Sequence, residues 1–278
     1  MLKKELAAIL GAATVAVVSC TSYQHNTQVI VETEEFEKKK KAKASKQPVL
    51  PTSKPNFAEI SDIPTKKKAF FDYLRPGIEL ENQRISEERS LIVSLKNQSS
   101  LSAKERQALT DLGQAYNLSF PAEGESTERW FEVMQQRVDF LPEALVLTQA
   151  ANESAWGTSR FATEASNYFG QWCYSEGCGL VPNKRPPGMT HEVAKFSDAS
   201  ESTHRYFMNV NRNPAYVELR RLRTKLRAQG DDILSPESAI ELAGGLIRYS
   251  ERGQYYVDDI RAMIRHNSTF WQQSDLNQ

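Results

Sequence analysis

The sequence predicts a mostly α-helical protein with a small β-hairpin or loop lobe, preceded by an N-terminal helical segment. Two observations carry this prediction. Apolar residues recur at helical spacing in most segments after residue 57, for instance at Trp130, Met134 and Val138. Residues 171–196 break the pattern, because they are rich in Gly, Pro and Cys, which is typical of a loop or hairpin.

Several helices are expected along the chain. A first helix that includes residues 69–74 should stop at Pro76, because an interior proline removes a backbone hydrogen bond and clashes with the preceding turn. Another should open at Pro142 and Glu143. The remaining expected helices cover residues 78–95, 103–118, 127–138, 216–228, 236–248 and 256–266.

The pattern divides the chain into four parts. Residues 1–19 read as a signal peptide, and residues 20–56 as a polar tether, expected to be disordered, that cannot bury a core. Residues 57–126 form the N-terminal helical segment, which either packs on the following domain or forms a module of its own. Residues 127–270 form the main helical domain.

The N-terminus carries an export signal, with Lys3 and Lys4 before an apolar stretch too short to span a bilayer. Its end, Val-Val-Ser-Cys20, resembles the lipobox of bacterial lipoproteins, which implies that Cys20 is lipidated and anchors the mature protein to a membrane. Thr21 after the cysteine resembles outer-membrane sorting. The alternative is an ordinary secretory signal with a stray thiol. The net charge of zero argues against a nucleic-acid partner.

An exported protein with three cysteines has one thiol that cannot form an intramolecular disulfide. Lipidation of Cys20 removes this problem and leaves Cys173 and Cys178 as an expected disulfide that closes a tight loop. The competing interpretation is half a zinc site with His191, but no second cysteine pair exists. We therefore expect no metal and no other cofactor.

Glu153 is the main candidate for a catalytic residue. It ends a helix that is apolar nearly all round, beside Trp156 and with Gly157 as a plausible C-cap. Desolvation, the negative end of the helix dipole and the lack of a nearer cation than Arg160 should each raise its pKa. A carboxyl kept neutral near pH 7 suits a general acid. The alternative is a glutamate at a helix end that points into water.

Two motifs in sequence order resemble the glucosaminidase family, glycoside hydrolase family 73. The segment Gln-Ala-Ala-Asn-Glu153-Ser-Ala-Trp-Gly-Thr-Ser matches the family signature Glu-Ser-x-x-Gly-x-Ser, and Asn167-Tyr-Phe-Gly matches Asn-Leu-Phe-Gly. Phe196-Ser-Asp-Ala, Pro214-Ala-Tyr and Tyr249 then follow in the family's order. The resemblance covers roughly residues 127–266 and implies a lysozyme-like fold.

The resemblance also implies an activity. The family hydrolyses the β-1,4 bond after N-acetylglucosamine in peptidoglycan glycan strands, with Glu153 as the general acid and Tyr249 close to the scissile bond. Tyr249 is followed by Ser-Glu where the family usually has Ala-Thr. The family's second carboxylate lies on a mobile hairpin, where Glu192, within a strand-like alternation, is favoured over Glu176. Inverting, retaining and substrate-assisted mechanisms all stay open.

Six residues are candidates for substrate contact: Trp156, Asn167, Phe169, Trp172, Tyr174 and Tyr216. Trp172 or Tyr174 is favoured for stacking on sugar rings, because a loop can present a ring to a cleft, whereas the other aromatic side chains could belong to the core. A basic stripe is expected to be a solvated helix face, with contact to acidic stem peptides as a second possibility; it comprises Arg220, Arg221, Arg223, Lys225 and Arg227.

Two other functions fit the same residues. A lytic transglycosylase shares the lysozyme-like fold and a single catalytic glutamate, but leaves an anhydro sugar. A lipoprotein that binds peptidoglycan without cleaving it is the alternative from another class. In each case the expected location is the periplasm, with a lipid anchor in the outer membrane, and the expected oligomeric state is a monomer.

Overall fold

The computed structural model describes residues 48–183 and 185–271. The predicted signal peptide, the lipidation of Cys20 and most of the predicted tether lie outside the described residues. Residues 48–56, the expected end of the tether, run along the domain, where the Lys54 ammonium donates to the carbonyls of Ala162 and Thr163 at 3.3 and 2.7 Å. None of the helices in the described part of the chain has both the length and the apolar character needed to cross a membrane.

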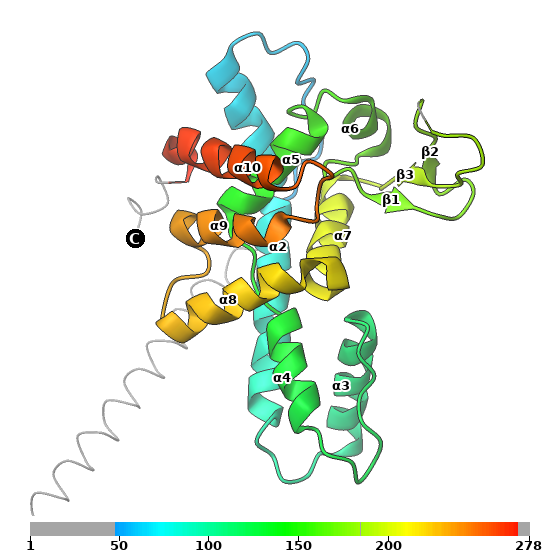
Figure 1. Cartoon of the computed structure of the whole chain (residues 1–278), viewed down its shortest axis with the longest axis vertical. Helices are drawn as coiled ribbons and strands as arrows, with labels where there is room; N and C mark the ends of the chain where they lie inside the picture. Colours follow the sequence, from blue (N-terminus) through cyan, green and yellow to red (C-terminus); the bar gives the residue numbers. More distant parts are fainter. Residues whose placement is uncertain (1–47, 184, 272–278) are drawn as a thin grey trace, which may run out of the picture. The chain divides into compact units, whose positions relative to one another are not determined.

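The described residues are mostly helical, with one small sheet (Figure 1), which confirms the predicted fold class. The helices are α2 (Ile63–Leu95), α3 (Ala103–Ala115), α4 (Glu128–Arg137), α5 (Glu143–Ser154), α6 (Arg160–Ala165), α7 (Ala199–Arg212), α8 (Val217–Gln229), α9 (Pro236–Ala243) and α10 (Gln254–His266). The 3-10 turns are η1 (Pro214–Tyr216), η2 (Gly244–Leu246) and η3 (Ser268–Phe270). Helices α6 and α7 lie outside the ranges expected from the sequence.

Helix α2 corrects one prediction, because it continues through Pro76 instead of ending there. An interior proline costs about 3 kcal/mol or more. Both halves of the helix are buried, with Phe70, Phe71 and Leu74 before the proline and Ile78 and further apolar residues after it. Packing against α7, α5 and α4 therefore outweighs the local preference for a break.

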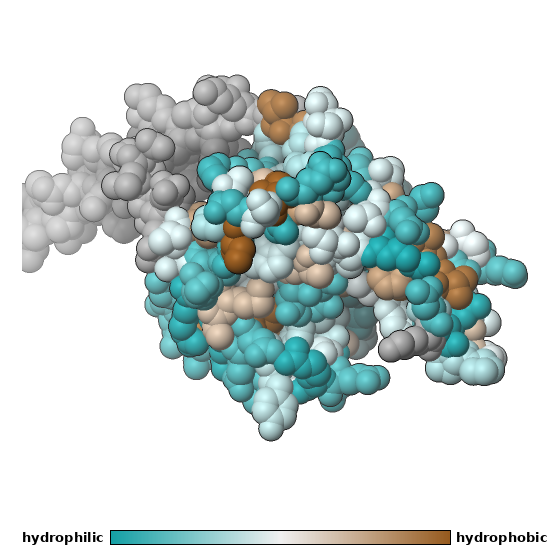
Figure 2. All heavy atoms as spheres, turned by 90° about the horizontal axis from the view of Figure 1, so that it is seen from above, coloured by the Kyte–Doolittle hydropathy of each residue, from teal (hydrophilic) through white to brown (hydrophobic). Residues whose placement is uncertain are grey.

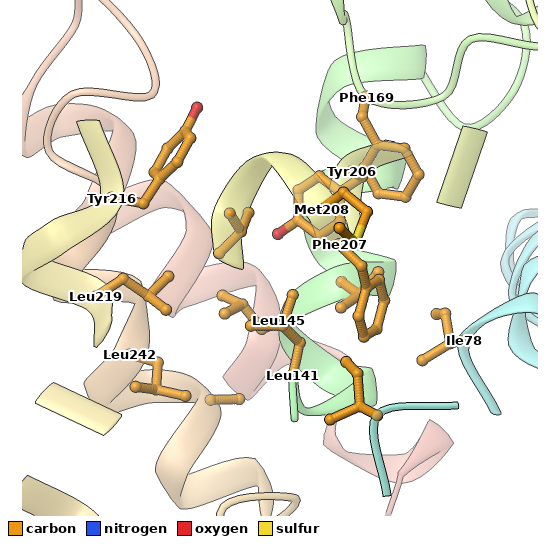
Figure 3. Close-up of a cluster of buried hydrophobic side chains, with 14 of the residues drawn as sticks. Ile78, Leu141, Leu145, Phe169, Tyr206, Phe207, Met208, Tyr216, Leu219 and Leu242 are labelled. Atoms are coloured by element: carbon orange, nitrogen blue, oxygen red, sulfur yellow. The ribbon is translucent and has the colours of Figure 1, made fainter. Parts of the chain in front are cut away.

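The hydrophobic core combines the N-terminal helices with the main domain. Ile78 of α2 lies in the same buried cluster as Leu145 of α5 and Phe207 of α7 (Figure 3), and Phe70 of α2 also belongs to this cluster. Residues 144–151 of α5 are all buried, as its apolar sequence predicts. Of the two arrangements considered for the N-terminal helices, the structure has them packed on the domain that follows.

The small lobe is a three-stranded antiparallel sheet in the order β1-β3-β2. Its strands are β1 (Trp172–Cys173), β2 (Gly179–Leu180) and β3 (Glu192–Ala194). In this register Trp172 pairs with Val193, and Cys173 pairs with Glu192. The lobe lies between α6 and α7 in sequence, and its presence confirms the hairpin lobe predicted for residues 171–196.

The basic stripe on α8 is only partly a solvated face, because Arg221 and Lys225 are exposed as predicted but two of the arginines are not. Arg220 and Arg223 are buried. Arg223 donates to the carbonyls of Gln136, Asp139 and Phe140 at 2.9–3.1 Å, and Arg227 pairs with the buried Asp139 carboxylate. Arg223 therefore satisfies backbone carbonyls at the end of α4 and in the connection to α5, and together with Arg227 it holds the entry into α5. Arg220 instead donates to the carbonyls of Val210 and Asn213.

Candidate active site

Glu153 lies in the last turn of α5, half-buried, as its sequence context predicts. Burial raises the pKa of its carboxyl, while hydrogen bonds from Tyr256 and Asn152 and the charge of Arg252 act in the opposite direction. The Asn152 amide donates to Glu153 Oε1 at 3.1 Å. The cation that acts on Glu153 is therefore Arg252, brought close by the fold, and not Arg160, its nearest basic neighbour in sequence.

The chain leaves α5 in an unusual turn directly after Glu153. Ala155, Trp156 and Gly157 all have positive φ, at 50°, 58° and 77°. The C-cap is therefore Ala155, in the left-handed conformation, and not Gly157 as predicted. A left-handed backbone disfavours residues other than glycine, so packing has to hold Ala155 and Trp156 in place.

Ser154 secures this turn from inside. Its buried hydroxyl donates to the Ala150 carbonyl at 2.6 Å and accepts from the Gly157 amide at 2.9 Å. The amide of Trp156 donates to Ala151 O at 2.9 Å. The serine that follows the glutamate in the motif thus has a structural task, since it ties the last turn of α5 to the residues that leave it.

The second motif lies beside the first. A Cβ placed on Gly170 would lie 3.5 Å from Glu153 Oε2, and the φ of Gly170 is +63°. Phe169 stacks on Tyr206 of α7, with ring centroids 4.2 Å apart (Figure 3). Glycine at 170 therefore allows the backbone to pass close to the carboxylate, and Phe169 fixes this backbone on the core.

Asn167 holds the base of the β lobe. Its amide donates to the carbonyls of Gln171 and Ala194 at 2.8 and 2.9 Å, and its side-chain oxygen accepts from the backbone amides of Phe169 and Gln171. The side chain is buried and all its groups are engaged. These contacts explain Asn167 as a residue that positions the loop, so substrate contact is not needed to account for it.

A chain of buried hydrogen bonds reaches Glu153 from the core. Tyr206 donates to Gln149 Oε1, the Gln149 amide donates to the Tyr256 hydroxyl at 3.0 Å, and Tyr256 in turn donates to Glu153. Gln149 lies one turn before Glu153 on α5, and both tyrosines have a raised pKa because they are buried. Each phenol therefore keeps its proton at physiological pH and can donate a hydrogen bond.

Tyr249 and Tyr216 lie on the same side of the site. The Tyr249 hydroxyl donates to Phe169 O at 2.7 Å, and its ring stacks on Tyr256 at 5.4 Å. Tyr216 is 6.0 Å from Tyr249 between ring centroids. Burial raises the pKa of both phenols, with a further contribution from the negative charge of Glu153. The structure thus brings Glu153, Tyr249 and Tyr216 together.

Comparisons with known proteins agree with this geometry. The glucosaminidase family model, described as mannosyl-glycoprotein endo-beta-N-acetylglucosaminidase, matches residues 128–269. The chain belongs to the glucosaminidase family. The chain is also 30% identical over 227 residues to "Protein bax" of Escherichia coli (strain K12), across 82% of this chain and 79% of that protein. No solved structure matches the chain.

Glu192, the favoured second carboxylate, holds the β lobe together. Its two oxygens accept from the backbone amides of Gly177 and Gly179 at 3.1 and 2.8 Å. These hydrogen bonds lower the pKa of the Glu192 carboxyl. Glu176, the other candidate, is exposed at the tip of the loop. Glu192 is therefore ionised and engaged in a structural contact, which leaves its part in catalysis a prediction.

Cys173 and Cys178 form the expected disulfide, with their Cα atoms 6.2 Å apart. Together with Glu192, they offer potential metal-ligand atoms within 4.8 Å of one another. Zinc sites use thiolate ligands, and the two sulfurs here are bonded to each other. As long as the disulfide is intact, this group stabilises the loop and does not suit a zinc ion.

The predicted aromatic contacts divide into two groups. Trp156, Phe169 and Tyr216 pack on other rings, Trp156 against Phe70 and Phe71 of α2. Trp172 and Tyr174 on the β lobe are 53% and 75% exposed, and Trp172 stacks on His191. Figure 2 shows a mainly hydrophilic face, on which hydrophobic residues are exposed in small separate groups. Of the predicted aromatic contacts, Tyr174 and the face of Trp172 away from His191 are thus the ones left exposed.

The sequence interpretation missed Tyr256, Gln149 and Arg252. Gln149 stands four residues before Glu153, so its position on the same helix face was available from the spacing. Tyr256 and Arg252 come from the region around the start of α10 and approach Glu153 only in the folded chain. Their local sequence carries no sign of this, because it also suits an ordinary amphipathic helix start.

Proposed function

We propose that this glucosaminidase hydrolyses the β-1,4 bond after N-acetylglucosamine in peptidoglycan, with Glu153 as the general acid. The observation that carries the proposal is a half-buried carboxyl of raised pKa at the junction of the two family motifs. A carboxyl of raised pKa keeps its proton closer to neutral pH, so it can protonate the oxygen of the leaving sugar.

The substrate follows from the family together with the N-terminal sequence. The family description names an endo-β-N-acetylglucosaminidase. Peptidoglycan strands contain N-acetylglucosamine in β-1,4 linkage, and an exported bacterial lipoprotein meets this polymer in the envelope. Trp172 and Tyr174 are the residues that we expect to stack on sugar rings.

The contacts of Glu192 favour a mechanism that needs only one free carboxylate. Both of its oxygens accept backbone hydrogen bonds inside the cysteine loop. Attack by the substrate's own acetamido group requires no second protein carboxylate. A lytic transglycosylase would also work with a single glutamate, so the contacts of Glu192 keep this second function under consideration.

The experiment is digestion of purified peptidoglycan with the full chain, followed by reduction and mass spectrometry of the new ends. Reduced N-acetylglucosamine ends are expected. Anhydro-muramic ends would replace the proposal with transglycosylation, and glycan binding without new ends would favour a binding lipoprotein. Glu153→Gln should keep glycan binding while its activity falls at least about 100-fold, the scale of general acid catalysis. Unchanged activity in Glu153→Gln would contradict the role of Glu153.

We further propose that Cys20 carries lipid and holds the enzyme at the periplasmic face of the outer membrane. The lipobox-like sequence before Cys20 and Thr21 after it support this location. Cells fed a labelled fatty acid should incorporate the label into the wild-type chain and not into Cys20→Ser. If the wild-type chain stays unlabelled and fractionates with soluble periplasmic proteins, the anchor does not exist.

A further inference from the structure

Phe57 lies directly against the turn that follows Glu153. A Cβ on Gly157 would come within 2.5 Å of Phe57 Cδ2 and 2.8 Å of its Cε2, so only a glycine fits between this ring and the turn. Phe57 is 2% exposed. This residue precedes α2, the first helix in the described part of the chain, and follows a segment whose composition gives no hint of a place near the site.

The same ring joins an aromatic cluster under the turn. Phe57 meets Phe70 at 5.5 Å and Tyr73 at 5.8 Å between centroids, and Phe70 meets Trp156 at 5.8 Å, all edge to face. Trp156 and Gly157 are two of the three consecutive positive-φ residues that form the turn after Glu153. The cluster therefore supports the part of the backbone that is least favourable by itself.

Lys54 provides a second contact between the segment before α2 and the region after Glu153. Its ammonium donates to the carbonyls of Ala162 and Thr163 in α6, the helix that starts three residues after Gly157. Carbonyls in the last turn of a helix have no partner within the helix, so a lysine is a suitable donor there. The segment from Lys54 to Phe57 thus contacts both the turn and the helix after it.

We propose that Phe57 and Lys54 are positioning residues for the reaction, which act on Glu153 through the turn formed by Ala155, Trp156 and Gly157. This inference rests on the proposed role of Glu153. The turn fixes the end of α5, and with it the carboxyl that has to reach the leaving oxygen. A shift of about 1 Å in a catalytic group can cost on the order of 100-fold in rate.

The test compares variants of the full chain on soluble glycan strands. Phe57→Ala should lower kcat about 10- to 100-fold, with KM changed less than about threefold, because the loss lies in orientation rather than in binding. The basic limb of its pH profile should move to lower pH, since a loosened turn lets water reach Glu153. Phe57→Leu should recover most of the rate, and Lys54→Met should show the same effects more weakly.

Phe131→Ala is the matched control. Phe131 is a buried phenylalanine of α4, a helix that contacts α2, α7 and α8. It should lower the unfolding temperature as much as Phe57→Ala does, yet keep the wild-type kcat and pH profile when both are assayed well below their melting points. If Phe57→Ala does not fold, Phe57→Leu and Lys54→Met carry the test.

Two results would overturn this inference. One is a wild-type kcat and pH profile in the Phe57 and Lys54 variants, while Glu153→Gln is inactive. The other is an equal loss of kcat in Phe131→Ala at matched stability, which would reduce the role of Phe57 to general packing. Full activity of Glu153→Gln would instead contradict the proposed function itself, so the two failures are distinguishable.

Discussion

The phenol of Tyr256 donates a hydrogen bond to the carboxylate of Glu153. The phenol oxygen itself accepts from Gln149, which is fixed by Tyr206. A donor to a carboxylate favours its charged form, whereas burial favours the neutral form. The pKa of Glu153 is raised because burial is the largest of these influences. Burial and the hydrogen bond from Tyr256 thus have opposite effects on the pKa of Glu153, and each can be changed by a separate substitution.

Tyr256→Phe removes the hydrogen bond and leaves the ring in place. The pKa of Glu153 should rise further, so the basic limb of the kcat/KM profile should move to higher pH. Stability should fall by about 1–3 kcal/mol, because the buried Gln149 amide loses its acceptor. Tyr255→Phe is the control, as Tyr255 is 77% exposed and should change neither quantity. A basic limb that stays in place would mean that the hydrogen bond does not tune Glu153.

Glu153→Gln should stabilise the fold at neutral pH. A carboxyl whose pKa is raised by folding contributes stability below its ordinary pKa and loses it as the pH rises through the raised value. Glutamine stays neutral, so the variant should gain stability at pH 7, by about 1.4 kcal/mol for each unit by which folding raises the pKa of Glu153. The gain should vanish below about pH 4, the ordinary range of a glutamate. Urea unfolding at both pH values measures the difference, and a variant less stable at pH 7 would contradict it.

Arg252→Gln removes a positive charge that acts on Glu153. Without this charge the ionised form is less favoured, so the basic limb of the activity profile should move to higher pH, more at low salt than at high salt. Arg221→Gln is a matched control, because Arg221 is also an exposed arginine paired with an acidic residue. Equal profiles for both variants would exclude a specific effect of Arg252.

Asp139→Asn should destabilise the fold by about 3–5 kcal/mol, because it leaves Arg89, Arg223 and Arg227 without their shared acid. The arginines lower the pKa of Asp139, so its contribution is present above the ordinary aspartate pKa and is lost as the pH falls through the lowered value. The two proteins should therefore converge in stability at strongly acid pH. Glu132→Gln, at an exposed pair, should cost less than about 1 kcal/mol in the same urea titration.

The sequence predicts those parts of the site that depend on neighbouring residues. The continuous apolar run of α5 places Glu153 at the end of a buried helix, and the glycines and cysteines of residues 171–196 indicate the small lobe. The turn after Glu153 was predicted only as far as a glycine cap. Both Ala155 and Trp156 are left-handed, and Trp156 packs on the distant ring of Phe70, for which local propensity gives no signal.

Long-range packing explains the errors. Pro76 is a strong local signal for a helix end, but the apolar residues on both sides of it face one core. Arg223 was expected to belong to a solvated stripe, because its acceptors are backbone carbonyls of another segment, which no side-chain pattern reveals. Arg252 and Tyr256 reach Glu153 for the same reason, by the approach of α10 to α5.

The continuous helix α2 extends the unit of folding beyond the region that the family model matches. The family match begins at residue 128, whereas Phe70, Phe71, Leu74 and Ile78 of α2 fill the same core as α5 and α7. A fusion protein that contained only the matched region would lack α2 and would expose the apolar residues that α2 covers. Any natural or engineered recombination of this enzyme therefore has to carry α2 along with the glutamate that it supports.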